Sequence, residues 1–134
     1  MTRTDDMAYE LTVKRDFVAH HFLTVPNPGP EGDVHSHHFV LEVRFAGPSL
    51  DEYGYLVDID DVNGILDDVI ERYRETVLND LEEFAGENPS VERFARVVGD
   101  RIENALSNSR PHELVVRLWE DDSAWASHRR ELRR

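Results

Sequence analysis

The sequence predicts an α+β fold in which a four-stranded antiparallel sheet is covered on one face by two helices. Two observations support this prediction. Apolar and polar residues alternate with a period of two in several short segments, which is typical of half-buried strands, and two longer segments have the three-and-four spacing of amphipathic helices. The order along the chain is strand, strand, short strand, helix, helix, strand. With 134 residues, we expect one domain spanning residues 1–134.

The first half of the chain predicts the strands. Residues 9–23 and residues 35–47 both place apolar side chains at even spacing on one face. Between them, residues 24–34 contain three Pro and two Gly without periodicity, which predicts a loop. Long ordered loops in small domains are often functional, so this loop is a candidate part of a site. A turn at residues 48–54 and a short strand at residues 55–59 follow.

The helices come next. Residues 60–81 have apolar side chains at helical spacing, and the acidic residues at their start suit the positive end of the helix dipole. Residues 82–90 contain a Gly and a Pro and break this helix. Ser90 is a suitable N-cap for the second helix, which is predicted from Val91 to Leu106.

The last predicted strand is residues 112–120, and the polar tail at residues 121–134 is predicted to be a short helix or a frayed end. The sheet face opposite the helices still carries apolar residues, which indicates contact with another subunit. These residues are Val18, Val40, Val115 and Trp119.

Acidic residues dominate the charge of the chain. There are 28 Asp and Glu against 15 Lys and Arg, a formal net charge of -13, and Lys14 is the only lysine. This charge repels phosphate backbones and anionic lipids, so we expect no nucleic-acid and no membrane binding. No long apolar run and no apolar segment near the start is present, which predicts a cytoplasmic location. Because the chain has no Cys, a transition metal must bind to His and carboxylates.

Three histidines are candidate metal ligands. His35 and His37 lie two apart on a strand, so their imidazoles project from the same face, and His21 joins them from the neighbouring antiparallel strand. Three neutral imidazoles with an open fourth position form a zinc site of the catalytic type. The alternative interpretation is a group of surface or hydrogen-bonded histidines without a metal.

Six short motifs occur in the order and approximate spacing of a known family. They are 17–21 (FVAHH), 35–37 (HSH), 54–58 (GYLVD), 78–80 (LND), 88–92 (NPSVE) and 118–120 (LWE). With these motifs, over about residues 9–122, the chain resembles the 6-pyruvoyl-tetrahydropterin synthases and the 6-carboxy-tetrahydropterin synthases. This resemblance implies the tetrahydropterin synthase fold (T-fold), in which sheets join into an oligomeric barrel, as a homotrimer or a homohexamer.

The resemblance also implies roles for individual residues. Glu120 matches the carboxylate that binds the pterin edge in a bidentate manner. Ser90 and Glu92 match polar residues beside it. Ser36 stands where the family usually has Gly, and the implied substrate is 7,8-dihydroneopterin triphosphate or a near relative. The three zinc ligands of the family correspond to His21, His35 and His37.

The chain departs from the family at its catalytic positions. Glu31 stands where the family has its catalytic Cys, and Arg74 and Glu75 stand where it has an Asp-His pair. Family members with Glu in place of Cys resemble enzymes that shorten the side chain to 6-hydroxymethyl-dihydropterin. Glu31 is therefore a candidate catalytic base, with an ordinary solvated loop acid as the alternative. Glu75 is interpreted as a solvated helix residue.

Three functions follow from these residues. The first is a zinc-dependent lyase of the 6-pyruvoyl/6-carboxy-tetrahydropterin synthase type. The second is side-chain cleavage to 6-hydroxymethyl-dihydropterin with Glu31 as the base. The third is a non-catalytic protein that binds zinc and a pterin. All three share the pterin ligand and the metal.

The excess of acidic residues, combined with a near absence of lysine, predicts adaptation to high salt. Self-repulsion within the folded chain falls when counter-ions screen it, so the melting temperature should rise between low salt and molar salt. Thermal melts in a chloride series test this prediction. A melting temperature that does not rise with salt would contradict it.

Overall fold

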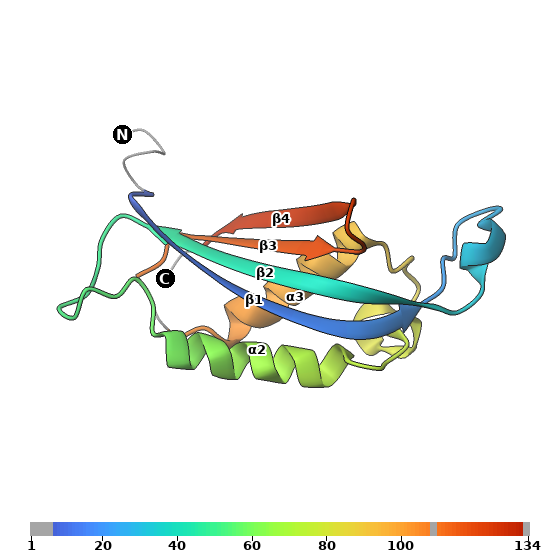
Figure 1. Cartoon of the computed structure of the whole chain (residues 1–134), viewed down its shortest axis with the longest axis horizontal. Helices are drawn as coiled ribbons and strands as arrows, with labels where there is room; N and C mark the ends of the chain where they lie inside the picture. The colour runs from blue at the N-terminus through green and yellow to red at the C-terminus, as the bar shows by residue number, and fades with distance from the viewer. Residues whose placement is uncertain (1–6, 108–109, 133–134) are drawn as a thin grey trace.

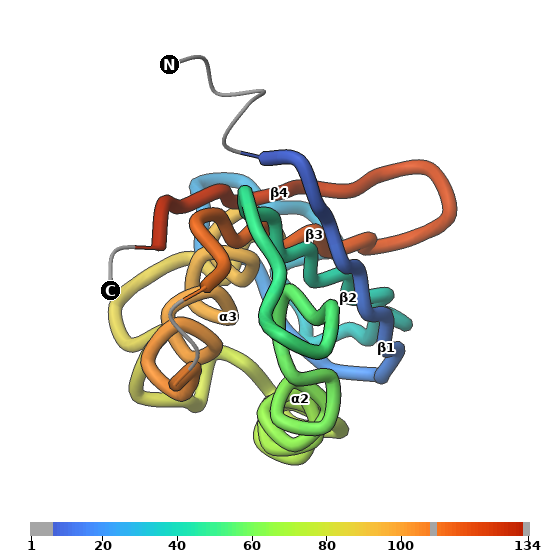
Figure 2. Tube along the Cα trace, turned by 90° about the vertical axis from the view of Figure 1, so that its left-hand side faces the viewer, coloured from blue at the N-terminus to red at the C-terminus, as the bar shows by residue number. Residues whose placement is uncertain are grey.

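The computed structural model describes residues 7–107 and 110–132, and predictions for residues 1–6, 108–109 and 133–134 lie outside this part. The predicted architecture is confirmed: a four-stranded antiparallel sheet carries two α-helices on one side (Figures 1 and 2). None of the described helices is long and apolar enough to cross a membrane. The elements are β1 (Tyr9–His21), η1 (Gly29–Gly32), β2 (His35–Gly47), α2 (Ile59–Tyr73), η2 (Leu78–Asp80), η3 (Glu82–Phe84), α3 (Val91–Ala105), β3 (Glu113–Trp119) and β4 (Trp125–Glu131), where η marks a 3-10 helix.

The strands follow one another across the sheet in chain order, β1-β2-β3-β4, and each neighbouring pair is antiparallel. The pairing of β1 with β2 is the longest and runs without interruption from Tyr9 opposite Gly47 to His21 opposite His35. The edges of the sheet are β1 and β4. Figure 1 shows the loop between β1 and β2 at one end of the sheet, with the loop before α2 at the other end.

The prediction for residues 121–134 is wrong, because this segment contains β4, the fourth strand of the sheet. The positions of β4 that face α3 are only half-buried and carry Ala126, His128 and Arg130. None of these is a large apolar residue. The segment therefore lacks the alternation by which a strand is recognised, although Arg130 bonds to α3 as described below.

The predicted strand at residues 55–59 is also wrong. This segment is a loop, and α2 begins at its last residue. Leu56 and Val57 are both buried, which explains their apolar character without a strand. Asp58 caps α2, because its side chain accepts a hydrogen bond from the backbone N–H of Asp60 at 2.9 Å.

The first helix is shorter than the predicted segment at residues 60–81. It ends at Tyr73, and Glu75 has a backbone φ of 57° that no α-helix tolerates. The chain then runs beside the edge of β1, where the Glu75 N–H donates to Val18 O at 2.7 Å and the His20 N–H donates to Thr76 O at 2.9 Å. The apolar spacing continues into η2, whose Leu78 is fully buried, and this continuation explains the overestimate.

The hydrophobic core lies between the sheet and the two helices. The helices bury one face each, and α3 packs on β3 and β4 while α2 lies beside β1 and α3. Burial of such side chains is the main favourable contribution to folding, about 1.5–3 kcal/mol for each large apolar side chain. The largest fully buried side chains are Tyr73, Phe39, Phe45, Phe84, Phe94, Leu41, Leu66, Leu78, Ile102, Leu114, Leu118 and Val43.

A glycine in α3 makes room for an arginine from β4. A Cβ atom at Gly99 would lie 2.7 Å from a guanidinium nitrogen of Arg130. That guanidinium donates to Asp100 Oδ1 at 2.8 Å, to Glu103 Oε1 at 3.1 Å and to the backbone oxygen of Arg96 at 3.1 Å. These bonds attach β4 to α3 through polar contacts instead of an apolar ridge.

A second polar cluster holds the segment that follows α2 against the two helices. Tyr73 is fully buried, and its hydroxyl donates to Glu83 Oε2 at 2.7 Å and accepts from Arg101 Nε at 2.9 Å. Arg72 donates to both carboxylate oxygens of Glu83 at 2.6 Å. The hydrogen bonds from Arg72, followed by that from Tyr73, lower the pKa of Glu83 from 4.5 to about 2, although partial burial opposes this shift.

We predict that Glu83→Gln destabilises the protein at pH 7 by about 1–3 kcal/mol, because it removes the charged partner of Arg72. The folded-state pKa lies below the ordinary value, so the contribution of Glu83 is complete above pH 4.5 and is lost as the pH falls towards 2. Urea unfolding at pH 7 and at pH 3 should show a smaller difference between wild type and variant at the lower pH. The exposed neighbour variant Glu82→Gln is the control, and an equal difference at both pH values would contradict the assignment.

Candidate metal centre and its surroundings

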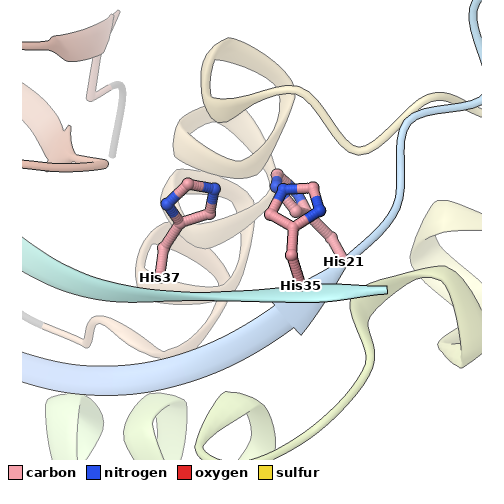
Figure 3. Close-up of side chains that lie close together, drawn as sticks. All are labelled: His21, His35 and His37. Atoms are coloured by element: carbon pink, nitrogen blue, oxygen red, sulfur yellow. The ribbon is translucent and has the colours of Figure 1, made fainter. Parts of the chain in front are cut away.

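Three histidines meet at the end of the sheet where β1 finishes and β2 begins (Figure 3). The strand register places His21 directly opposite His35, and His37 lies two residues further along β2 on the same face. The ring centroids are 4.6 Å apart for His21 and His35, and 5.0 Å apart for each pair that includes His37. One potential ligand atom from each of the three residues lies within 4.8 Å of the others.

Backbone carbonyls orient two of these rings. His21 Nδ1 lies 2.9 Å from Pro89 O, and His35 Nδ1 lies 2.9 Å from Asp33 O. A carbonyl oxygen can only accept a hydrogen bond, so both Nδ1 atoms carry the proton and both Nε2 atoms of the neutral rings present a lone pair. Carbonyl partners of this kind are typical of metal-bound histidines.

The remaining nitrogens lack hydrogen-bond partners. The Nε2 atoms of His21, His35 and His37 are all buried and form no hydrogen bond with any described residue. Burial, followed by the charges of the two other histidines, outweighs the bond to Pro89 and lowers the pKa of His21, which keeps this ring neutral. Unsatisfied buried nitrogens are uncommon in proteins, and three convergent imidazole nitrogens, of which those of His21 and His35 present lone pairs, fit a divalent transition metal such as Zn²⁺.

Glu120 lies beside the triad, directly after β3. Its Oε1 is 3.0 Å from His37 Nε2, and the side chains of both residues are less than a quarter exposed. Despite this short distance, His37 Nε2 forms no hydrogen bond with a described residue. A carboxylate oxygen and an imidazole lone pair repel each other at this distance unless a cation or a proton stands between them. The position of Glu120 therefore agrees with a cation at the triad.

The N-terminus of α3 adjoins the same site through Pro89. Ser90 caps α3, because its hydroxyl accepts a hydrogen bond from the Arg93 N–H at 3.1 Å, and the preceding carbonyl belongs to Pro89, the partner of His21. Glu92 lies in the first turn of α3 and is exposed. Ser90 is thus adjacent to the triad, whereas no contact between Glu92 and the three histidines is seen among the described residues.

Glu31 lies in η1, in the loop that connects β1 to β2. Its side chain is exposed, and its backbone oxygen accepts a hydrogen bond from the Leu23 N–H at 2.8 Å. The carboxylate is close enough to His21 to act on that ring by its charge, which opposes the lowering of the His21 pKa. The structure therefore brings Glu31 towards the triad without placing it in contact with a ligand.

The opposite face of the same strands carries a chain of polar contacts that the sequence did not reveal. His20 Nδ1 lies 2.6 Å from Ser36 Oγ, and His20 Nε2 lies 3.4 Å from Glu75 Oε2. The interpretation of Glu75 as a solvated helix residue is wrong in part: its side chain is largely exposed, but the residue lies in the turn after α2 and pairs with His20. His38 on this face pairs with Asp16 at 2.6 Å.

The fold and the convergent histidines define a class of protein: a small α+β domain with a candidate metal site at one end of its sheet. A family model described as 6-pyruvoyl tetrahydropterin synthase matches residues 10–131. The chain belongs to this family of pterin synthases, which are lyases.

Named relatives agree with this assignment. The chain is 29% identical over 119 residues to a putative 6-carboxy-5,6,7,8-tetrahydropterin synthase of Archaeoglobus fulgidus, covering 88% of this chain and 93% of the relative. It is 28% identical over 103 residues to the 6-carboxy-5,6,7,8-tetrahydropterin synthase of Bacillus subtilis, covering 74% and 68% of the two chains.

Solved structures confirm the fold. The 6-pyruvoyl tetrahydropterin synthase of Caenorhabditis elegans has a TM-score of 0.76 at 18% identity, covering 93% of this chain and 98% of that one. A Plasmodium vivax 6-pyruvoyltetrahydropterin synthase has a TM-score of 0.76 at 14% identity, covering 92% and 98%. Two of the P. vivax structures are variants in which a glutamate, described as a catalytic residue, is replaced by alanine or cysteine.

We predict that His35→Ala reduces zinc affinity by a factor of about 100 or more, because it removes one of three ligands. Zinc titration followed by metal analysis measures this directly. Because a ligand that binds only the folded state stabilises it, zinc should also raise the melting temperature of the wild type but not of the variant. His38→Ala is the matched control, since His38 is exposed on the other face of β2. Equal zinc binding by both variants would contradict the triad.

Proposed function

We propose that this protein is a zinc-dependent pterin synthase that acts on 7,8-dihydroneopterin triphosphate, with a 6-pyruvoyl- or 6-carboxy-tetrahydropterin as its product. The observation that carries this proposal is the group of three buried, unpartnered Nε2 atoms of His21, His35 and His37. Membership of the pterin synthase family supports the class of substrate.

The residues around the triad have separate tasks in this proposal. A zinc ion held by the three histidines would act as a Lewis acid that makes neighbouring C–H and O–H bonds of the substrate side chain more acidic. Glu120 accepts hydrogen bonds from the amino and ring N–H groups of the pterin, a bidentate pairing that a partly buried carboxylate makes well. Ser90 and Glu92 at the start of α3 bind the adjacent polar edge of the ring.

Glu31 is the proposed base. It comes from the loop between the two strands that carry the histidines, and its charge already acts on His21. A carboxylate that takes a proton from the substrate side chain replaces the Cys of the family pattern. The P. vivax synthase, whose described catalytic residue is a glutamate, offers a precedent for this residue type.

The identity of the base also favours a second reaction. With Glu31 in this position, proton removal from the second side-chain hydroxyl would cleave the bond between the first and second side-chain carbons. The outer fragment would leave as an aldehyde that keeps the triphosphate, and return of a proton to the first carbon would give 6-hydroxymethyl-dihydropterin. A third hypothesis is a protein that binds zinc and a pterin without turnover. It uses the same binding residues as the two enzymes but has no role for Glu31. The product separates these three functions.

We further propose a homotrimer or homohexamer in which the sheets join into a barrel. Among the described elements, β4 has one side without a strand partner, and so has the part of β1 before Val18; Val18 and His20 already bond to Glu75 and Thr76. Joining β4 of one copy to β1 of the next satisfies these edges and closes the sheet. Apolar side chains on the face away from the helices, including Val40 and Trp119, are half-buried in the single chain. They would become more buried inside a barrel.

We predict that the zinc-loaded protein, incubated with 7,8-dihydroneopterin triphosphate in molar salt, forms a product identifiable by mass. Glu31→Gln should lower the rate by roughly 100- to 10,000-fold and leave zinc bound, because it removes the base without touching a ligand. Glu52→Gln, an exposed loop residue, is the control.

Each outcome has a distinct meaning. A 6-pyruvoyl or 6-carboxy product supports the first function, and 6-hydroxymethyl-dihydropterin supports the second. Full zinc occupancy without any product supports the binding protein. An unchanged rate in Glu31→Gln would show that Glu31 is only a loop residue.

A further inference from the structure

The loop between β1 and β2, residues 22–34, carries the proposed base and has no hydrophobic anchor. Figure 1 shows this loop projecting beyond the end of the sheet. None of its residues is buried, and its two valines, Val25 and Val34, are 40% and 57% exposed. Burial of apolar side chains usually fixes a segment against the core. The position of this loop therefore depends on polar contacts.

Two asparagines hold the first residues of the loop. Asn79, in η2, pairs with both backbone groups of Phe22: its Oδ1 accepts from the Phe22 N–H at 3.0 Å, and its Nδ2 donates to Phe22 O at 2.9 Å. Asn88, just before α3, accepts from the Thr24 N–H at 2.8 Å and from the Thr24 hydroxyl at 3.4 Å through its Oδ1. An amide side chain can replace a backbone partner in this way, because it carries both a donor and an acceptor. The motifs at 78–80 and 88–92 thus contact the loop through their asparagines.

The residue between these two contacts bonds to Glu31. The Leu23 N–H donates to Glu31 O at 2.8 Å, while Phe22 and Thr24 on either side bond to the asparagines. This bond closes the loop at its base and joins the backbone of Glu31 to a segment that is held on both sides. The two asparagines therefore act on the position of Glu31 through residues 22–24.

Both asparagines are themselves held in place. Asn79 follows Leu78, which is fully buried in the core. The backbone oxygen of Asn88 accepts hydrogen bonds from the Ser90 N–H at 2.9 Å and from the Arg93 guanidinium at 2.9 Å, which attaches it to the first turn of α3. The loop is therefore bound to two elements, η2 and α3, that pack against the core.

The contact at Asn88 also adjoins the metal triad. Asn88 directly precedes Pro89, whose oxygen lies 2.9 Å from His21 Nδ1. The segment that orients a candidate metal ligand thus also holds the loop that carries the proposed base. A base must lie within hydrogen-bond reach of the proton that it removes, and a misplacement of about 1 Å can cost about 100-fold in rate.

We propose that Asn79 and Asn88 are positioning residues that hold Glu31 at the metal triad. This inference rests on the role of Glu31 as the base in the proposed function. Among the described residues, neither asparagine side chain bonds to a triad histidine, so both act through the backbone of residues 22–24. Asn88 uses only its Oδ1 in these contacts, whereas Asn79 uses its oxygen and its nitrogen. An aspartate should therefore replace Asn88 but not Asn79.

Amide hydrogen exchange of the metal-free protein tests these contacts without turnover. The Leu23 amide should be protected in the wild type and should exchange faster by about tenfold or more in Asn79→Ala and in Asn88→Ala, because the loop opens locally. Asn88→Asp should keep the wild-type rate, and Asn79→Asp should not. Amides of the β2–β3 ladder should keep their rates in all four variants.

An unprotected Leu23 amide in the wild type would overturn the inference, as would equal protection of this amide in the wild type and all four variants. If an alanine variant does not fold, the comparison of Asn88→Asp with Asn79→Asp decides.

Turnover separates positioning of the base from a general structural role. In the zinc-loaded protein, Asn88→Ala should lower kcat by about tenfold or more, while KM and the zinc affinity change by less than about threefold. Asn88→Asp should restore kcat. In the Glu31→Gln background, Asn88→Ala should lower the rate no further, because no base is left to position.

An equal loss of rate in both backgrounds would overturn the inference. If the wild type forms no product, the proposed function fails, and amide exchange alone decides whether the asparagines hold the loop. The two failures are therefore distinguishable.

Discussion

The uninterrupted pairing of β1 with β2 is the constraint on which both the core and the candidate site depend. It sets the parity of every side chain along the two strands, so a slip by one residue would move one whole set to the other face. The same parity that buries Phe17 and Phe39 also directs His21, His35 and His37 to a single point. Packing of the core thus selects the register, and the register assembles the site.

The site is continuous with the aromatic core beneath it. The ring of Phe39 lies 5.6 Å from His37 and 6.4 Å from His21 between centroids, and it packs in turn on Phe17 at 5.6 Å and Phe94 at 5.2 Å. Rigid packing restricts the rotamers of the imidazoles, and the carbonyl partners restrict their rotation about the ring axis. The three Nε2 atoms are therefore held close together, and none of them has a hydrogen-bond partner among the described residues.

Much of this arrangement could be predicted from the sequence, because period-two alternation records which strand faces are buried. The three histidines share the parity of the apolar residues, and this is visible without a structure. Their carbonyl partners are not visible, because Pro89 is 68 residues from His21 and only the folded chain brings them together. The fourth strand was missed because Arg130 packs against α3 through hydrogen bonds, which leave no hydrophobic pattern. The end of α2 was missed because Leu78 keeps the helical spacing after the backbone has turned at Glu75.

The proposed assembly affects the surroundings of the candidate base, Glu31. A base such as Glu31 works best where bulk water is excluded, yet this residue is exposed in the single chain. A neighbouring copy can join β1 only along the part of its edge before Val18, because Val18 and His20 already bond to Glu75 and Thr76 of the same chain. The stagger between adjacent sheets would then determine which part of the neighbour covers the histidine end. In this arrangement, the strand pairing between copies decides how much water reaches the proposed base.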